Sequence, residues 1–324
     1  MNSKPFFWLL TTVLLATAPL AEAQQQAKIF KIGWLVNPGP GSGRELFRRE
    51  FRELGYVEGK NIAIEYRSAE GKLGRLPTLA DELVRLKVDV LVTSSTSGAL
   101  ALKNATRTIP IVFLGVTDPV AAGLIDSLAR PGGNLTGLTN IGAVLAGKRL
   151  ELLKETVPKL SRVAVLWSPR ETGSAQQWKE SLHPARELGL QLHSMEVSSA
   201  DKFESAFKEA IKARSAALAV TQSPLAASRQ KQIVDIAAKS RLPAIYPRED
   251  YVGSGGLMSY GADRIEPYRR AAWMVDKILK GAKPAEIPVE QPMRFELLIN
   301  FKTAHALGLT IPPIVLMRAT KVVK

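Results

Sequence analysis

The middle of this chain repeats itself at an offset of about 130 residues. Segments 53–113 and 187–246 each contain, in the same order, a Glu-Leu-Gly turn, two apolar strand-like runs and a third apolar run that holds a proline. Each copy follows an apolar strand of its own, at 31–36 and at 162–167. Strands that alternate with amphipathic segments of helix length indicate α/β units. The repeat therefore predicts two α/β lobes of one design.

Two lobes of this kind also predict where a ligand binds. Open parallel sheets bind ligands in a crevice at the carboxyl ends of their strands. A pair of them places these ends around a shared space. The expected fold class is therefore α/β, with two doubly wound parallel-sheet lobes and a ligand cleft between them.

Strand and turn signals give the expected layout of the chain. In the first lobe we expect strands at 28–36, 62–66, 88–93, 111–114 and 135–138, and helices at 44–54, 76–86, 98–106 and 120–128. The C-terminal part is too short for a third copy, so it must cross between the existing lobes. We expect lobe 1 to comprise 28–143 and about 259–283, lobe 2 to comprise 144–258 and about 284–310, and 311–324 to form a tail. Hinge segments are expected near 139–143, 259–262 and 283–288.

Residues 1–23 carry the pattern of a secretory signal peptide. Lys4 precedes an apolar run over 6–20, and the small-x-small triplet Ala21-Glu22-Ala23 follows, which is the pattern that a signal peptidase cleaves. The run is interrupted by polar residues and a proline, whereas a membrane-spanning helix needs about 20 apolar residues. A retained anchor is the weaker alternative. We expect a mature protein that begins at Gln24 and lies outside the cytoplasm.

Composition excludes several classes of function. The chain has no cysteine, which removes disulfides, thiolate catalysis and zinc-thiolate sites. The three histidines, His183, His193 and His305, lie far apart without ligand-spaced partners, so neither a metal site nor histidine-based catalysis is expected. The net charge of +14 comes from basic residues interleaved with acidic ones along predicted helices. Such a pattern indicates solvated helix faces, and no nucleic-acid partner is expected.

A glycine-rich stretch at 39–43 follows the first strand and invites comparison with a phosphate-binding loop. Arg44 stands where the dinucleotide fingerprint requires glycine, and Pro40 lacks an amide that a pyrophosphate would use. No cofactor is therefore expected.

Several blocks of the sequence resemble the ABC-transporter substrate-binding protein family whose better-known members bind tryptophan or tyrosine. These blocks cover nearly the whole chain after the signal segment and lie at 108–113, 116–124, 128–137, 241–246, 255–261, 279–284 and 306–313. The resemblance implies a type I periplasmic binding protein fold, in which two lobes joined by a three-crossing hinge close on a small ligand and hand it to a membrane permease. It leaves the identity of the ligand open.

Polar turns at two equivalent strand ends are candidate ligand contacts. Ser95, Thr96 and Ser97 lie between a predicted strand and a predicted helix, so their hydroxyls and the free amides of the first helical turn face the expected cleft. A helix start of this kind favours an anion such as a carboxylate. Capping of the helix is the competing interpretation. Thr221 and Gln222 form the corresponding turn of the second lobe.

A second group of candidates combines an acid with aromatic rings. Asp118 precedes Pro119, which suits a helix cap, and its second carboxylate oxygen is free to hold a ligand ammonium. Phe113 and Tyr246 occupy equivalent strand ends and would sandwich a flat ligand, although core packing competes with this interpretation. Further candidates at the rim of the cleft are Asp250, Ser259 and Tyr260.

These features favour a periplasmic solute-binding receptor of an ABC importer. The expected ligand is small, carries a carboxylate and is amino-acid-like or aromatic, and it is bound by cleft closure without catalysis. The expected partners are this ligand and an ABC permease in the inner membrane, and the protein is expected to be monomeric. Two alternatives stay open from the sequence: a ligand-sensing partner of a membrane receptor kinase, and a secreted enzyme that uses Asp118 in the cleft.

Overall fold

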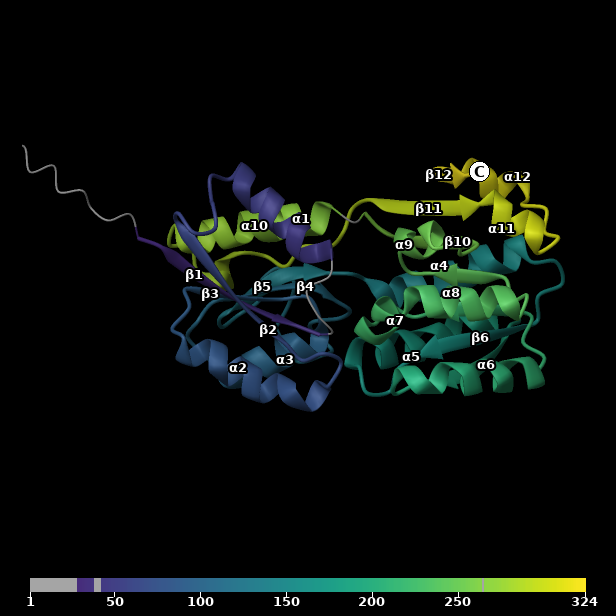
Figure 1. The fold of residues 1–324 in the computed structure, drawn as a ribbon, viewed down its shortest axis with the longest axis horizontal. Helices are drawn as coiled ribbons and strands as arrows, with labels where there is room; N and C mark the ends of the chain where they lie inside the picture. Colours follow the sequence, from purple (N-terminus) through teal and green to yellow (C-terminus); the bar gives the residue numbers. More distant parts are fainter. Residues whose placement is uncertain (1–27, 38–41, 264) are drawn as a thin grey trace, which may run out of the picture.

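The computed structural model describes residues 28–37, 42–263 and 265–324, and these form two lobes that lie side by side (Figure 1). Each lobe has a central sheet with helices on both faces, which confirms the expected α/β class with two parallel-sheet lobes. The expected signal peptide at 1–23 lies outside the described residues. Within the described part of the chain, no helix combines the length and the apolar character needed to cross a bilayer.

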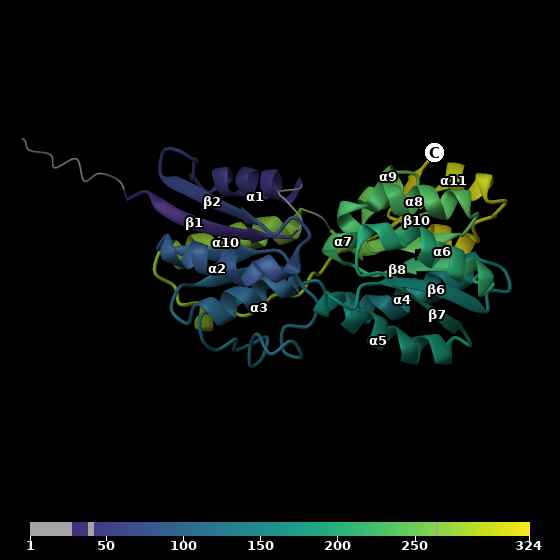
Figure 2. The same ribbon diagram turned by 60° about the horizontal axis from the view of Figure 1, so that its bottom comes forward.

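Lobe 1 is built on a parallel sheet with the strand order β2-β1-β3-β4-β5. Its strands are β1 (Phe30–Val36), β2 (Ile62–Ser68), β3 (Val90–Thr93), β4 (Ile111–Val116) and β5 (Leu135–Thr139). Helices α1 (Ser42–Glu53) and α10 (Glu266–Leu279) cover one face, and α2 (Leu76–Arg85) and α3 (Thr96–Ala105) cover the other (Figure 2).

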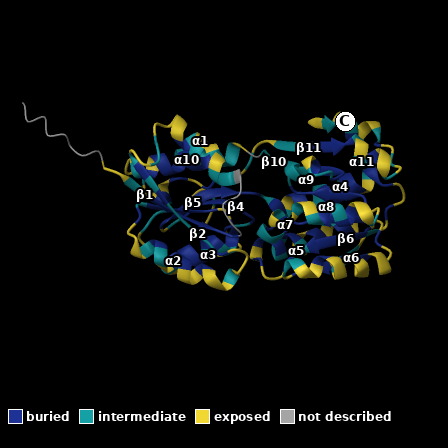
Figure 3. Ribbon diagram, in the orientation of Figure 1, coloured by how far each residue is buried: buried dark blue, intermediate teal, exposed yellow. Residues whose placement is uncertain are grey.

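Alternation along β1 explains why this sheet needs helices on both faces. Ile32, Trp34 and Val36 pack in the cluster with α1 and α10, whereas Leu35 packs in the cluster with α2 and α3. Successive side chains of a strand point to opposite faces, so a strand that is apolar throughout must be buried on both sides. Figure 3 shows the result as buried strands between helices whose outer sides are exposed.

Lobe 2 contains the larger sheet, with the order β12-β11-β10-β9-β8-β6-β7. Its strands are β6 (Arg162–Trp167), β7 (Gln191–Glu196), β8 (Ala217–Val220), β9 (Ala244–Tyr246), β10 (Met258–Ala262), β11 (Phe295–Asn300) and β12 (Lys321–Val323). The pair β10–β11 is antiparallel, and the other neighbours pair in parallel.

Helices cover both faces of the lobe 2 sheet as well. One face carries α4 (Gly142–Thr156), α5 (Thr172–Glu187), α11 (Phe301–Ala306) and α12 (Pro313–Met317). The other face carries α6 (Phe203–Lys212), α7 (Pro224–Ser228), α8 (Gln230–Lys239) and α9 (Glu249–Gly253).

Three connections join the lobes, and their positions differ in part from the expected boundaries. Residues 259–262 belong to β10 of the second sheet and not to lobe 1. Residues 284–290 stay with lobe 1, because the Val289 amide donates to the Leu128 carbonyl (2.8 Å) and Ile287 is buried beside α10. The third connection therefore runs over 291–294 instead of 283–288. The expected tail at 311–324 is part of lobe 2, since β12 pairs with β11.

The helix expected at 120–128 does not form. The segment after Asp118 is a series of turns. Gly123 has a positive φ of 67°, and Gly132 and Gly133 have φ values of 69° and 61°. Glycine adopts this left-handed backbone readily, so the glycines favour turns over the continuous helix that the apolar residues alone suggest.

Candidate functional site

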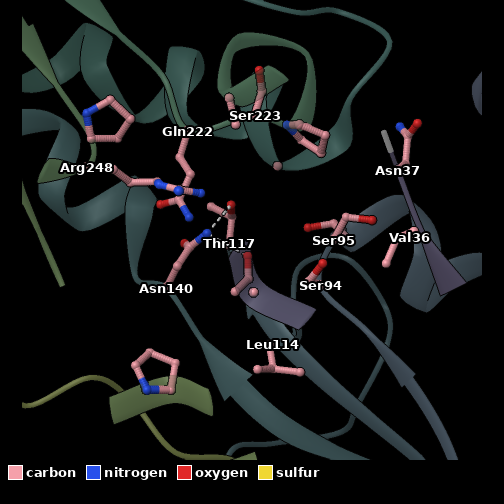
Figure 4. A pocket seen from close by; sticks show the side chains of 18 of the residues that line it. Val36, Asn37, Ser94, Ser95, Leu114, Thr117, Asn140, Gln222, Ser223 and Arg248 are labelled. Atoms are coloured by element: carbon pink, nitrogen blue, oxygen red, sulfur yellow. Dashed lines mark hydrogen bonds between the residues drawn. The ribbon is translucent and has the colours of Figure 1, made fainter. Parts of the chain in front are cut away.

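A cavity of about 700 Å³ lies between the lobes, where the carboxyl ends of the strands of both sheets meet. Figure 4 looks into it, with Ser94, Ser95 and Leu114 on the lobe 1 side and Gln222 and Arg248 on the lobe 2 side. Its volume falls in the range of small-molecule sites, about 300–1,000 Å³. The cleft predicted from the internal repeat is therefore present.

The hydroxyl-rich turn before α3 forms part of the lobe 1 wall. Ser95 is extended and caps the helix, since its Oγ accepts a hydrogen bond from the Gly98 amide at 3.1 Å. The first amides of a helix have no acceptor within the helix, and here the capping serine satisfies only that of Gly98. The amides of Thr96 and Ser97 thus begin a helix whose positive dipole end faces the cavity.

Asn140 holds the first connection between the lobes against the strand ends of lobe 1. Its Nδ2 donates to the Gly115 carbonyl (2.6 Å) and to Thr117 Oγ1 (3.4 Å), as Figure 4 shows for the second bond. Its Oδ1 accepts from the Gly142 amide at 2.7 Å. Ile141 between them has a φ of 43°, which is a strained conformation for a β-branched residue. This cavity wall is therefore also part of the hinge.

Aromatic side chains line the far end of the lobe 1 wall. Trp34 of β1 and Tyr66 of β2 are register partners, and their rings stack with centroids 5.9 Å apart. The Arg44 guanidinium lies 3.8 Å from the centre of the Tyr66 ring, a cation–π contact. Burial raises the pKa of the Tyr66 hydroxyl, although Arg44 opposes the rise. All three residues line the cavity and offer a flat, partly cationic surface.

Glu171 is the acidic group of the lobe 2 wall that lacks a cationic partner among the described residues. It precedes α5 and is only 6% exposed. Its Oε1 accepts a hydrogen bond from the Leu225 amide at 3.1 Å, whereas Oε2 is buried and has no hydrogen-bond partner within the described part of the chain. Burial raises the pKa of this carboxyl, and the neighbouring Ser223 hydroxyl and Leu225 amide oppose the rise. A buried carboxylate oxygen without a donor invites a cationic or hydrogen-bonding ligand.

The remaining charges on the lobe 2 wall neutralise one another. Arg248 donates from Nε to Asp250 Oδ1 at 3.2 Å and from Nη2 to Oδ2. Burial works to lower the pKa of Arg248, but the carboxylate of Asp250 outweighs it, and the pKa is raised. Gln222 is fixed separately, because its amide donates to Gln177 Oε1 (2.9 Å) and its carbonyl accepts from Gln177 Nε2 (3.0 Å).

The lobes touch at Gly173, near the start of α5. A Cβ atom on this glycine would lie 2.6 Å from Thr117 Oγ1 and 3.0 Å from Thr96 Oγ1, both on lobe 1. Only glycine permits this close approach. The contact also places the lobe 2 segment that carries Glu171 directly opposite the start of α3.

Five of the residues predicted from the sequence line this cavity: Ser95, Thr96, Ser97, Gln222 and Asp250. They come from the N-cap and first turn of α3, from the turn after β8 and from α9. The structure thus brings together the two polar turns that the repeat relates. Asp250 is already paired with Arg248, so it orients this arginine.

The two predicted aromatic residues lie outside the cavity lining. Phe113 is fully buried against α2 and α3, and its neighbour Leu114 lines the cavity instead. Tyr246 is 1% exposed and stacks on Tyr251 with ring centroids 4.8 Å apart. Because side chains alternate along a strand, the residue one position along, here Leu114 or Pro247, reaches the cavity. The two rings are core residues and do not face each other.

Four further predicted residues also lie outside the lining. Asp118 uses Oδ1 to accept from the amides of Val120 (3.1 Å) and Ala121 (3.0 Å) and so caps a turn. Thr221 is buried in a bond with Ser174 Oγ (2.8 Å). Ser259 and Tyr260 belong to β10, where Ser259 is buried and Tyr260 packs on the lobe 2 core.

Several cavity-lining residues on strands or in the segments after them are not among those predicted from the sequence. The most informative of them are Trp34, Arg44, Tyr66, Asn140 and Glu171. A usable signal was present, because in a parallel sheet every loop after a strand reaches the same edge. The loops after β1 and β6 therefore reach the cleft for the same reason as the loops after β3 and β8.

Comparison with known proteins agrees with this architecture. A family model for the ABC transporter substrate binding protein family matches residues 42–323. A curated tyrosine-binding protein of Clostridioides difficile is 30% identical over 289 residues, which cover 89% of this chain and 83% of that protein.

Two solved structures are similar over the whole fold. A conserved domain protein from Vibrio cholerae has a TM-score of 0.85 and 30% identity, and an ABC domain from Streptococcus pneumonia in complex with L-Trp has a TM-score of 0.83 and 29% identity. In both cases the match covers 91% of this chain and 100% of the other. Because the family model spans both lobes and the cavity between them, the chain belongs to the ABC transporter substrate binding protein family.

Proposed function

We propose that this protein is the periplasmic binding component of an ABC importer and that it binds an aromatic amino acid between its lobes. The observation that carries the proposal is the pairing, across one cavity, of a helix start on lobe 1 with the unpaired Glu171 carboxylate on lobe 2. The relatives support the ligand class, since one is named for tyrosine and another was solved with L-Trp.

The two ends of an amino-acid backbone fit the two walls. The ligand carboxylate accepts hydrogen bonds from the amides and hydroxyls of Thr96 and Ser97, where the helix dipole favours negative charge. The ligand ammonium donates to Glu171 Oε2 on the opposite lobe. Since the contact at Gly173 holds these segments close together, one ligand engages both lobes at once.

The ligand side chain then extends along the lobe 1 wall toward β1 and β2. Trp34 and Tyr66 supply aromatic faces there, and stacking of aromatic rings adds about 0.5–1.5 kcal/mol beyond the area that is buried. The buried Trp34 Nε1 has no hydrogen-bond partner in the described structure and is available to a polar ring substituent. These contacts favour tyrosine or tryptophan over an aliphatic amino acid.

Substitution of Glu171 by glutamine tests the ammonium contact. Glu171→Gln keeps the size of the side chain and an oxygen for the Leu225 amide, but it removes the charge that pairs with the ligand. A hydrogen bond to a charged group contributes about 1.5–3 kcal/mol, so the affinity for L-tyrosine or L-tryptophan should fall at least tenfold. Titration calorimetry of the parent and the variant measures this change. A desamino analogue, which has no ammonium group, should bind both proteins equally.

The pH dependence gives this prediction a separate signature. Burial raises the pKa of Glu171 in the empty site, and an arriving ammonium lowers it. Binding should therefore release a proton in the pH range between these two pKa values, and calorimetry in phosphate and Tris buffers detects the release. Because the pKa of Glu171 is higher in the folded protein than in the unfolded one, ionisation of this carboxyl lowers the free energy of unfolding as pH rises through that pKa. Glutamine does not ionise, so Glu171→Gln should be at least as stable as the parent at pH 8. If Glu171→Gln bound L-tyrosine and L-tryptophan as tightly as the parent, Glu171 would not contact the ligand ammonium.

Cleft closure links binding to transport in this proposal. A ligand held by both walls stabilises the closed arrangement of the lobes relative to the open one. A permease in the inner membrane then recognises the closed form. A thermal-shift screen with the standard amino acids tests the ligand class, and the absence of any stabilisation by an aromatic amino acid would reject it.

The mature protein should begin at Gln24, because the triplet before it fits the cleavage pattern. We expect osmotic shock of cells that express the full chain to release a protein whose N-terminal sequence starts there. Mass spectrometry of the released and the membrane fractions checks this. A protein that stays in washed membranes with residues 1–23 attached would instead be anchored.

A further inference from the structure

Lobe 2 buries an arginine that has no acidic partner in the described structure. Arg149 lies in the middle of α4 and is 2% exposed. Its Nε donates to the Tyr260 carbonyl at 2.8 Å, whereas its Nη2 is buried without a hydrogen-bond partner among the described residues. Burial lowers the pKa of the guanidinium to about 10, so the group stays charged at neutral pH.

Arg149 also lines a small cavity inside lobe 2 that is separate from the ligand cleft. Its volume is about 20 Å³, which exceeds the roughly 10–15 Å³ that one water molecule requires. Arg149 lines it together with Gln177, Ser181 and Thr221, and the rest of the wall is apolar. The three polar neighbours already bond elsewhere: Gln177 to Gln222, Ser181 to the Trp178 carbonyl and Thr221 to Ser174.

The charge of Arg149 decides which occupant fits this cavity. A water molecule would accept one hydrogen bond from Nη2 but would leave a full positive charge in an apolar surrounding. An uncompensated buried charge is strongly unfavourable, and buried charges in proteins are normally paired. A small monovalent anion satisfies the donor and the charge together. We propose that this cavity is a halide site, in which a chloride ion accepts a hydrogen bond from Arg149 Nη2.

The position of the site gives it a structural role. Arg149 ties α4, which follows the first connection between the lobes, to β10, which precedes the second. A bound anion neutralises the guanidinium and so stabilises this tie. Gln177 lines the small cavity. It also accepts a hydrogen bond from the backbone amide of Gln222 and so holds that residue at the ligand cleft.

Thermal unfolding in two salts tests the site. The parent protein is unfolded in sodium chloride and in sodium gluconate at equal ionic strength, because gluconate is too large for the cavity. An ion that binds only the folded state raises the melting temperature, and we expect a difference of about 3 °C in favour of chloride. Arg149→Met should abolish this difference. Lys208→Met removes one positive charge from an exposed position of α6 and should preserve it.

Diffraction provides a second measurement that does not depend on the folding of a variant. Crystals of the parent grown or soaked in sodium bromide should show an anomalous peak within hydrogen-bond distance of Arg149 Nη2. Equal melting temperatures in chloride and gluconate, together with no bromide peak, would mean that the cavity holds water only and would overturn the proposal. A salt difference that persists in Arg149→Met would place the chloride effect elsewhere and would equally overturn it.

Discussion

Gly173→Val should weaken the binding of an aromatic amino acid about a hundredfold while leaving the empty protein folded. A Cβ at this position already comes within 2.6 Å of Thr117 and 3.0 Å of Thr96 on the other lobe, and valine adds two methyl groups. Overpacking of this kind costs about 1–3 kcal/mol, the upper end of which corresponds to roughly a hundredfold in affinity. In the empty protein the hinge absorbs the clash by opening. Calorimetry with L-tyrosine and L-tryptophan measures the loss.

Two control variants distinguish a side chain that keeps the lobes apart from one that clashes directly with the ligand. Gly253→Val places the same side chain in open space on lobe 2 and should bind like the parent. Thr117→Ala in the Gly173→Val background removes the nearest clashing oxygen and should restore part of the affinity. Small-angle scattering should show that Gly173→Val does not compact on adding the amino acid. Parent-like affinity of Gly173→Val would show that closure does not bring these surfaces together.

Tyr246→Ala should lower the free energy of unfolding by about 3–5 kcal/mol, the range for truncating a large buried side chain. The ring is 1% exposed, stacks on Tyr251, and would lie 2.6 Å from a Cβ on Gly256. Its removal therefore leaves a cavity in the lobe 2 core. Urea unfolding monitored by circular dichroism measures the loss.

The binding data then distinguish a core residue from a ligand-stacking one. Tyr246→Phe keeps the ring and should retain most of the stability. The folded fraction of Tyr246→Ala should show the same ratio of affinities for aromatic and aliphatic ligands as the parent. A selective loss of affinity for aromatic ligands at unchanged stability would return Tyr246 to the binding site.

The two-lobe architecture was predictable because it is encoded twice. Related strand and turn signals at a constant offset indicate one unit used two times, and the structure confirms two such lobes. The expected boundaries place residues 259–262 in lobe 1, whereas they belong to β10 of lobe 2, because an apolar run shows that a strand is buried but not which sheet it joins. Tertiary pairing decides this, and here the antiparallel partner β11 draws the strand into the second sheet.

Of the candidate site, only the polar turns that follow strands could be predicted from the sequence. Ser95 and Gln222 are each the second residue after a strand, so their position at the cleft comes from topology alone. Phe113 required knowledge of which face of β4 meets the cavity, and a shift of one residue reverses the answer. Trp34 and Tyr66 resemble core residues by their spacing, and they serve as both core and wall. Glu171 lies in the loop after β6, so topology places it near the cleft, but its lack of a cationic partner is visible only in three dimensions.

The position of α10 in the chain affects when the first lobe is able to fold. The core of lobe 1 contains Ala271, Met274, Val275 and Ile278 of this helix, and Ile287 just beyond it. Ribosomes add roughly 5–20 residues per second, and domains usually fold in the order in which they emerge. Here lobe 1 lacks part of one core face until nearly the whole polypeptide has been made, although α1 already covers the rest of that face. Such a delay suits a chain whose proposed signal peptide directs it across a membrane before it folds.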